Sequence, residues 1–204
     1  MLGYRIARGI LIGYTKLFYR VKVIGKENQI KEGGCVIIAN HSSLFDPIAV
    51  AVAIKRDIKF LAKSDLEKHA ILRWLFKRFG VVSINRGASD MVALRKVCEI
   101  VSGGDVTGIF PQGTRIECAT PDIETALPGI GLIAGRAKVP ILPVAICYGK
   151  KNKKPKLFRK LRVAIGEPIP YEEYGFINGE KANSHEIAKY AFGKVCKAFE
   201  ENNI

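Results

Sequence analysis

The sequence lacks the features that mark several large classes of protein. It contains no run of about 18–20 nearly uncharged apolar residues, so we expect no membrane-spanning helix. The two most apolar stretches, residues 7–18 and 129–148, are each interrupted by two basic residues. No cleavage-site pattern follows the first of them, which argues against a signal peptide. Any contact with a membrane would therefore be made from its surface.

The common catalytic and cofactor motifs are also missing. There is no GxSxG nucleophile turn, no GxxxxGK[ST] or GxGxxG phosphate loop, and no CxxC pair. The chain has only three histidines, and its five cysteines show no metal-ligand spacing. We expect neither a metal nor another cofactor, and we expect the cysteines to be reduced thiols of a cytosolic protein.

Basic residues, in contrast, are abundant. The chain has 33 Lys and Arg against 19 Asp and Glu, a formal net charge of +14. Such a surface attracts nucleic acid, an anionic membrane leaflet or phosphorylated substrates. A nucleic-acid-binding module would need aromatic residues interleaved with basic ones, and the most basic run, residues 150–162, contains only Phe158. That run is either a solvated loop or a contact with an anionic surface.

The first 20 residues predict an amphipathic helix. Leu2, Ile6, Ile10 and Tyr14 recur at every fourth position, and no acidic residue precedes Glu27. A basic amphipathic helix of this type lies in a bilayer interface, but a helix packed on its own domain shows the same stripe. Both interpretations remain open, and we treat residues 1–20 as a helical element preceding a domain over residues 21–204.

The rest of the chain predicts a single α/β domain with a mostly parallel sheet flanked by helices, because strand-like and helix-like segments alternate along it. The predicted strands are residues 19–24, 35–39, 58–62, 81–84, 106–110, 141–147 and 161–165. The predicted helices are residues 47–55, 66–79, 89–102, 129–138 and 184–202.

The sequence NHSSLFD, residues 40–46, follows a short buried strand and precedes a helix opened by Pro47. Ligands of α/β folds bind at such carboxyl ends of strands. His41 is therefore a potential general base, and Asp46 can fold back to hydrogen-bond its imidazole. Asp46 could instead cap the helix that begins at Pro47. The other two histidines lie in polar helical stretches and are expected at the surface.

Two further strand ends carry cations. Arg86 ends the segment GVVSINR, and Arg115 ends FPQGTR, in which Gly113 would let backbone N–H groups approach an oxyanion or a phosphate. The segment VPILPV, residues 139–144, is predicted to pack near the site without taking part in chemistry. A base together with two cations for a phosphate, and no protein nucleophile, suggests that a substrate hydroxyl attacks an activated acyl group directly.

These four blocks, in this order, resemble the signature of the glycerolipid acyltransferases, the PlsC-like group that includes 1-acyl-sn-glycerol-3-phosphate acyltransferase. The resemblance covers about residues 21–165. It implies a glycerol-3-phosphate acyltransferase-like fold, with His41 as the base and Asp46 as the residue that holds it. It further implies that substrate phosphate is bound by Lys63, Arg86, Gly113, Thr114 and Arg115, with Asn40 and Gln112 supporting the site.

By the same resemblance, the reaction moves a fatty acyl group from acyl-CoA or acyl-carrier protein to the 2-hydroxyl of 1-acyl-glycerol-3-phosphate. The product would be phosphatidic acid, made for phospholipid biosynthesis by a peripheral protein on the cytoplasmic face of the cell membrane. No nucleic-acid partner is expected.

This sequence departs from the family pattern in two places. Gln112 stands where the family usually has Glu, and Ala-Leu-Pro precedes Gly129 where an aromatic-Lys pair is common. Gln keeps an acceptor oxygen but loses the charge. Both departures leave other acceptors open: a lyso-phospholipid, glycerol-3-phosphate, or a lyso amino-acid lipid.

Overall fold

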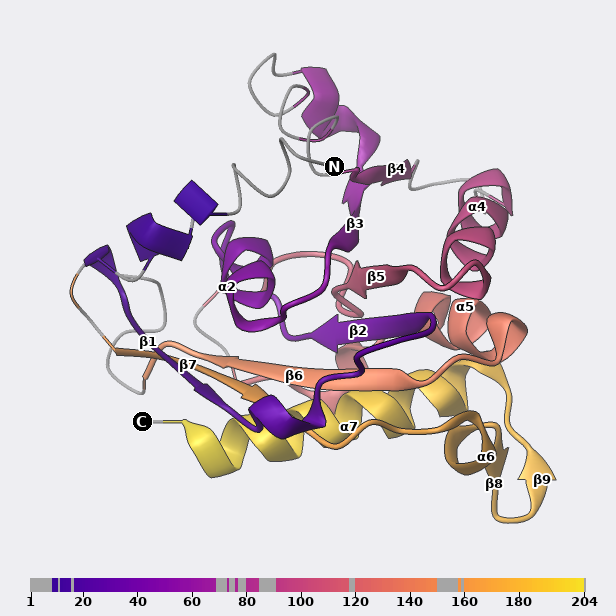
Figure 1. Ribbon diagram of the computed structural model, residues 1–204. Coiled ribbons are helices and arrows are strands. Elements are labelled where there is room, and N and C mark those ends of the chain that lie inside the picture. The colour runs from indigo at the N-terminus through magenta and orange to yellow at the C-terminus, as the bar shows by residue number, and fades with distance from the viewer. Residues whose placement is uncertain are drawn as a thin grey trace.

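A seven-stranded sheet forms the centre of the protein. The computed structural model describes residues 9–203 except 11, 16, 69–72, 74, 75, 77–79, 85–90, 118, 119, 150–157 and 159, and gives the backbone alone at 63, 66, 67 and 84. The strand order is β1-β7-β6-β2-β5-β3-β4 (Figure 1). The strands are β1 (Arg20–Ile24), β2 (Cys35–Ala39), β3 (Ile58–Lys63), β4 (Val82–Ile84), β5 (Val106–Ile109), β6 (Ile141–Cys147) and β7 (Lys160–Ile165).

Five neighbouring strands, from β6 to β4, are parallel, whereas β7 pairs antiparallel with β6 and β1 pairs parallel with β7. The predicted fold class, a single α/β domain with a mostly parallel sheet flanked by helices, is confirmed.

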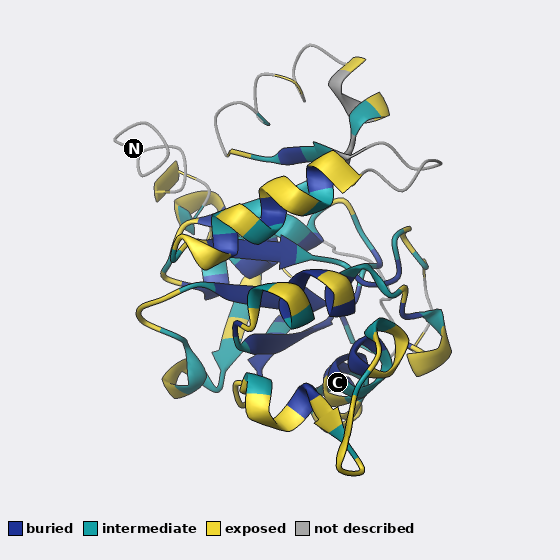
Figure 2. Ribbon diagram, turned by 90° about the vertical axis from the view of Figure 1, so that its right-hand side faces the viewer, coloured by how far each residue is buried: buried dark blue, intermediate teal, exposed yellow. Residues whose placement is uncertain are grey.

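Helices cover both faces of the sheet (Figure 1). On one face lie α4 (Met91–Ser102), α5 (Gly129–Ala137) and α7 (Ser184–Asn202), and on the other lies α2 (Asp46–Ala53). Each helix is present because it carries an apolar stripe that the sheet buries, as the dark inner surfaces in Figure 2 show. Helix α7 begins with a capping box, in which the side chains and backbones of Asn183 and Glu186 bond each other reciprocally.

The central strands are buried on both faces. All five residues of β2 and all seven of β6 are inaccessible, so these strands are continuous apolar runs and not alternating ones. Successive side chains of β2 enter opposite cores: Val36 and Ile38 face α4, α5 and α7, whereas Cys35 and Ile37 face α2. The two cores therefore fix the register of β2, and with it the position of the turn that follows.

Some helices and strands of the structure differ from those predicted from the sequence. Residues 9, 10, 12–15, 17 and 18 are helical, in agreement with the predicted amphipathic helix. The predicted helix over residues 66–79 lies largely outside the described residues, and its first three residues belong to the short 3-10 helix η2 (Ser64–Lys68). The sequence did not reveal the small unit after β7, formed by α6 (Tyr171–Tyr174), β8 (Phe176–Ile177) and β9 (Glu180–Lys181).

None of the helices that the structure describes is both long enough and apolar enough to cross a bilayer.

Candidate active site

The site residues that the structure describes gather at one edge of the sheet, because parallel strands end there. Reading from β6 to β3, the strand ends deliver Tyr148, His41, the turn 110–115 and the backbone of Lys63. Strands β2 and β5 are neighbours, so His41 and the turn 110–115 start side by side. Strand β4 is three positions from β2, roughly 14 Å away at the usual strand spacing.

His41 and Asp46 contact each other directly. The Nδ1 atom of His41 lies 2.8 Å from Oδ2 of Asp46, whose side chain is fully buried, and the His41 side chain is 17% exposed. A carboxylate can only accept, so Nδ1 carries the proton and Nε2 is left with its lone pair. The geometry that the motif predicted is thus present, and it leaves Nε2 available to accept a proton.

The Asp46 carboxylate accepts hydrogen bonds from several other groups besides His41. Its Oδ2 also accepts from the backbone N–H groups of Ser42 and Ser43, each at 2.7 Å, and its Oδ1 accepts from the hydroxyl of Tyr148 at 2.5 Å. The alternative role of Asp46 as a helix cap is wrong. Phe45 occupies the cap position without a side-chain hydrogen bond, and Asp46 is the first residue of α2.

Neighbouring strands fix the backbone on either side of the His41 side chain. Oε1 of Gln112 accepts from the His41 N–H at 2.7 Å, and the N–H of Ile116 donates to the His41 carbonyl at 2.8 Å. The Asn40 amide pairs with the backbone of Ile146, donating at 3.0 Å and accepting at 2.8 Å. Asn40 and Gln112 therefore hold the backbone of the turn, and their supporting role in catalysis stays a prediction.

The side-chain oxygen of Gln112 accepts a hydrogen bond from the backbone N–H of His41. The Gln112 side chain is 7% exposed, and the oxygen satisfies a donor that would otherwise be buried beside the site. This contact requires no negative charge, so the departure from the family pattern does not disturb the position of His41.

The turn after β5 is shaped by Gly113. Its φ angle is +67°, in the left-handed region, and a Cβ atom there would lie 2.5 Å from Leu127 Cδ1. The Gly113 N–H donates to the Phe110 carbonyl at 3.0 Å and so closes the turn. Because the Gly113 N–H donates within the turn, it does not point at an oxyanion, which corrects the expectation for this group.

The residues that follow, Thr114 and Arg115, are exposed. They directly precede Ile116, whose N–H donates to the His41 carbonyl. The exposed guanidinium of Arg115 therefore belongs to the residue next to this hydrogen bond. Phosphate binding by these two residues remains a prediction, with their placement beside the base in its favour. Arg86 and the side chain of Lys63 lie outside the described residues, and their roles remain predictions as well.

Two aromatic side chains contact the His41–Asp46 pair, and neither role was predicted from the sequence. The Phe110 ring stacks on the His41 imidazole, with centroids 4.2 Å apart and planes 21° apart. Tyr148, the first residue after β6, reaches Asp46 from the other neighbouring strand. Their only sequence signal is their position at the ends of buried strands, and the strand order that makes them neighbours of β2 is not legible in the sequence.

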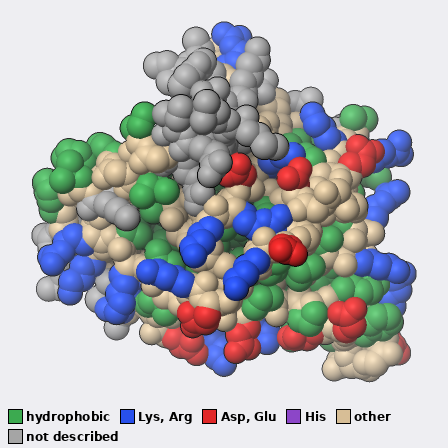
Figure 3. All heavy atoms as spheres, viewed as in Figure 1, with side chains coloured by type: hydrophobic (Ala, Val, Ile, Leu, Met, Phe, Trp, Pro, Cys, Tyr) green, Lys and Arg blue, Asp and Glu red, His purple; other side chains and the backbone are tan. Residues whose placement is uncertain are grey.

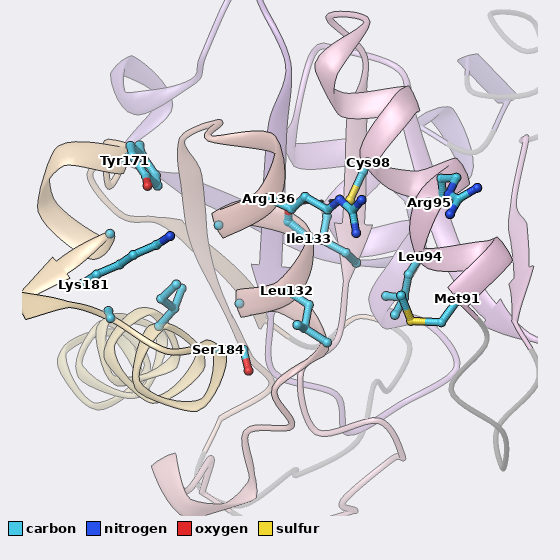
Figure 4. A pocket seen from close by; sticks show the side chains of 15 residues that line it. Met91, Leu94, Arg95, Cys98, Leu132, Ile133, Arg136, Tyr171, Lys181 and Ser184 are labelled. Atoms are coloured by element: carbon cyan, nitrogen blue, oxygen red, sulfur yellow. Dashed lines mark hydrogen bonds between the residues drawn. The ribbon is translucent and has the colours of Figure 1, made fainter.

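A cavity of about 320 Å³ lies elsewhere, between α4, α5 and the segment leading into α7 (Figure 4). Among the described residues that line it, none belongs to the predicted site. Its charged lining residues are Arg95, Arg136 and Lys181. Within the described parts of the chain, no three His, Cys, Asp or Glu side chains are grouped as metal ligands.

Comparison with known proteins finds a matching family model and several similar proteins. Residues 20–147 match the model of the family described as Acyltransferase. A 1-acyl-sn-glycerol-3-phosphate acyltransferase of Bacillus subtilis is 28% identical over 160 residues, which is 77% of each chain. A probable 1-acyl-sn-glycerol-3-phosphate acyltransferase of Mycoplasma genitalium is 29% identical over 178 residues, 83% of this chain and 59% of that protein.

A solved structure has the same fold. The crystal structure of the 1-acyl-sn-glycerophosphate (LPA) acyltransferase PlsC from Thermotoga maritima superposes with a TM-score of 0.72 at 28% identity, covering 97% of this chain and 80% of that one. The matched family region, residues 20–147, contains His41, Asp46 and the turn 110–115.

Proposed function

This chain belongs to the acyltransferase family, and on that premise we propose that it transfers a fatty acyl group to the free 2-hydroxyl of 1-acyl-glycerol-3-phosphate. The observation that carries the proposal is the His41–Asp46 pair at 2.8 Å, because it presents Nε2 of a correctly protonated imidazole at the edge of the sheet. The named relatives act on the same class of acceptor.

In the proposed reaction, Nε2 of His41 takes the proton of the acceptor hydroxyl as its oxygen attacks the carbonyl carbon of an acyl thioester. The new C–O ester bond forms and the C–S bond breaks. The proton on His41 then passes to the departing thiolate, which leaves as the free thiol. Asp46 stabilises the imidazolium between these two events. The balance requires no redox step and no covalent intermediate on the protein, because a thiolate leaves readily.

The phosphate of the acceptor is assigned to the cationic loop beside the base. Arg115 offers a planar fork of donors for phosphate oxygens, and its loop is tied to His41 by the Ile116 hydrogen bond of 2.8 Å. A phosphate held there would bring a glycerol hydroxyl toward Nε2. Acyl-CoA and acyl-carrier protein are both suitable donors, since both present the acyl group as a thioester.

A panel of acceptors tests this proposal. The purified protein would be given labelled acyl-CoA or acyl-carrier protein together with 1-acyl-glycerol-3-phosphate, glycerol-3-phosphate or a lyso-phospholipid with a head group. We expect labelled phosphatidic acid as the main product, formed in a phospholipid-synthesis step. Transfer to one of the other acceptors alone would reassign the substrate, and absence of transfer to all of them would refute the proposal.

We also propose that the protein works on the cytoplasmic face of the membrane as a peripheral protein. Ile10 and Leu17 of the helical segment are 68% and 70% exposed, and Phe158 beside it is 64% exposed. Phe18 joins them, since its ring lies 6.0 Å from that of Phe158 and its carbonyl accepts from the Phe158 N–H. The apolar surface therefore continues from the helix onto the loop before β7.

Exposed basic side chains occur on the elements that follow this helical segment and Phe158 in the sequence. Figure 3 shows Lys and Arg side chains gathered on one face of the molecule, and exposed basic residues occur on β1, η1 (Lys26–Asn28) and β7: Arg20, Lys22, Lys26 and Lys160. An apolar element combined with basic side chains gives the two signals that stable attachment to an anionic leaflet needs.

Sedimentation with vesicles tests this attachment. We expect the protein to bind vesicles rich in anionic lipid more strongly than zwitterionic ones, and Leu17→Glu to weaken binding. The matched control is Leu132→Glu on α5, a leucine that is 48% exposed on a helix distant from the N-terminal segment. Equal loss in both variants, or equal binding to both vesicles, would contradict the proposal.

A further inference from the structure

Tyr148 is a buried tyrosine whose hydroxyl is connected to the candidate base, His41, through the Asp46 carboxylate. It directly follows β6 and is 6% exposed. Its hydroxyl donates to Oδ1 of Asp46 at 2.5 Å, and Oδ2 of the same carboxylate lies 2.8 Å from Nδ1 of His41. Tyrosine, aspartate and histidine thus form a continuous hydrogen-bonded chain across three elements: β6, α2 and the turn after β2.

The two carboxylate oxygens have different partners. Oδ2 accepts from His41 and from the Ser42 and Ser43 N–H groups, whereas Oδ1 accepts from the Tyr148 hydroxyl. Burial raises the pKa of Tyr148 far above its usual range, and the adjacent Asp46 carboxylate raises that pKa further. The tyrosine therefore stays protonated at any working pH, and its hydroxyl is a permanent donor to Asp46.

A donor of this kind has two effects on the base. It fixes the rotation of the carboxylate and thereby the plane of the imidazole. It also draws charge toward Oδ1 and so weakens the attraction that Asp46 exerts on a proton at His41.

We infer that Tyr148 is a positioning residue of the acyl-transfer site, which orients the Asp46 carboxylate and, through it, the His41 imidazole, and which moderates the attraction of Asp46 for a proton on His41. The inference rests on the proposed function for its effect on catalysis, but the hydrogen-bonded chain itself does not depend on the substrate.

Removing the hydroxyl separates this role from simple core filling. In Tyr148→Phe the ring remains, but Oδ1 loses its donor and Asp46 attracts the His41 proton more strongly. We expect kcat/KM near neutral pH to fall about tenfold. We also expect the acid limb of the pH profile to move to higher pH, so that much of the activity returns in more alkaline buffer.

The chain offers a matched control in Tyr174. This tyrosine is also fully buried, and its hydroxyl lies 2.9 Å from the Ala134 carbonyl and 2.7 Å from that of Val139, in the core on the opposite face of the sheet. Tyr174→Phe removes a comparable buried hydroxyl without touching Asp46. It should change thermal stability alone and leave the pH profile in place.

Among the residues that the structure describes, few titratable groups contact this hydrogen-bonded chain, and the charged side chain of Arg115 is on the neighbouring loop. Asp46 lies on the Nδ1 side of His41, Tyr148 lies behind Asp46, and Tyr19 acts on Tyr148 from the N-terminal side. Phe110 and Gln112, from the end of β5, contribute no charge. A displacement of the acid limb that is specific to Tyr148→Phe can therefore be assigned to loss of the Tyr148 hydroxyl, which donates to Asp46 and also interacts with the Ser43 side chain.

The ¹H–¹⁵N resonances of the His41 ring give the decisive reading, because they need no substrate. We expect the midpoint of the His41 titration to lie at higher pH in Tyr148→Phe than in the wild-type protein, and to be unchanged in Tyr174→Phe. The other two histidines serve as internal references. Superposable titration curves for Tyr148→Phe and wild type would overturn the inference, even if acyl transfer is observed. Failure of acyl transfer in the wild-type protein would refute the proposed function and leave this test intact.

Discussion

Loss of the hydrogen bond between the Gln112 side chain and the backbone of His41 should lower both the stability and the activity of the protein. In Gln112→Met the side chain keeps its length and approximate volume, but the acceptor that lies 2.7 Å from the His41 N–H is gone. A buried donor left without a partner costs about 1–3 kcal/mol. For a chain of this size each kcal/mol lowers Tm by about 2–4 °C, so the expected fall in Tm is about 2–12 °C.

The same substitution should slow catalysis, because it removes one of the two bonds that hold the His41 backbone. A displacement of about 1 Å can reduce kcat/KM by on the order of 100-fold. We expect a loss of about 10- to 100-fold in kcat/KM for acyl transfer. In Gln112→Glu the acceptor oxygen is retained, so the loss in Tm should be smaller than in Gln112→Met, whereas the added charge should raise KM for a phosphate-bearing acceptor.

Gln29 provides the control. Its Oε1 accepts from the Lys55 N–H at 2.8 Å, the same type of contact at an exposed position. Gln29→Met should lower Tm by less than Gln112→Met and leave kcat/KM unchanged. Thermal unfolding and steady-state kinetics on the three variants measure both quantities. If Gln112→Met matches the wild type in Tm and in kcat/KM, the argument that Gln112 holds the catalytic turn is refuted.

Three further predictions follow from the site and the core. Gly113→Ala should lower the free energy of unfolding by about 1–3 kcal/mol, because φ is +67° and the new Cβ would lie 2.5 Å from Leu127 Cδ1. Gly179→Ala, at φ +82° with no atom near the new Cβ, should lower it by less, and denaturant unfolding of both variants measures the difference. Arg115→Ala should raise KM for a phosphate-bearing acceptor with little change in kcat, and added salt should narrow the difference between variant and wild type. Burial raises the pKa of the Cys147 thiol to about 12. At pH values well below about 12, iodoacetamide should therefore alkylate Cys147 only after the protein unfolds. Labelling of Cys147 in the native protein at the rate of a free thiol would contradict its burial.

The fold was largely predictable from the sequence because strand and helix periods alternate clearly along it. The continuous apolar runs of β2 and β6 indicated buried strands of a parallel sheet, and both strands have the predicted limits. The antiparallel junction of β6 and β7 was not predictable, because no residue pattern distinguishes it from a crossover. The unit formed by α6, β8 and β9 was missed since its elements are only two to four residues long.

The site was predictable where its residues share one local segment. His41 and Asp46 are five positions apart, so a single turn brings them together, and the motif alone indicated the contact. The contacts of Gln112 and Tyr148 join residues separated by 71 and 102 positions. Such contacts depend on which strands neighbour β2, and that order is a property of tertiary packing.

The helix-cap alternative for Asp46 failed for a related reason. A carboxylate at the start of a helix normally bonds the N–H groups ahead of it, but here it bonds those of Ser42 and Ser43 behind it, together with two side chains. The preceding turn doubles back over the start of α2, and that path is set by the buried Asn40 pairing with β6.

The most direct test of the account measures acyl transfer from a labelled thioester to 1-acyl-glycerol-3-phosphate by His41→Ala, alongside His185→Ala as a control at an exposed histidine. General-base catalysis of this kind contributes about 10²- to 10⁴-fold, so His41→Ala should lose at least about 100-fold in kcat while remaining folded by circular dichroism, and His185→Ala should match the wild type. A folded His41→Ala protein that retains wild-type kcat would contradict the assignment of His41 as the base.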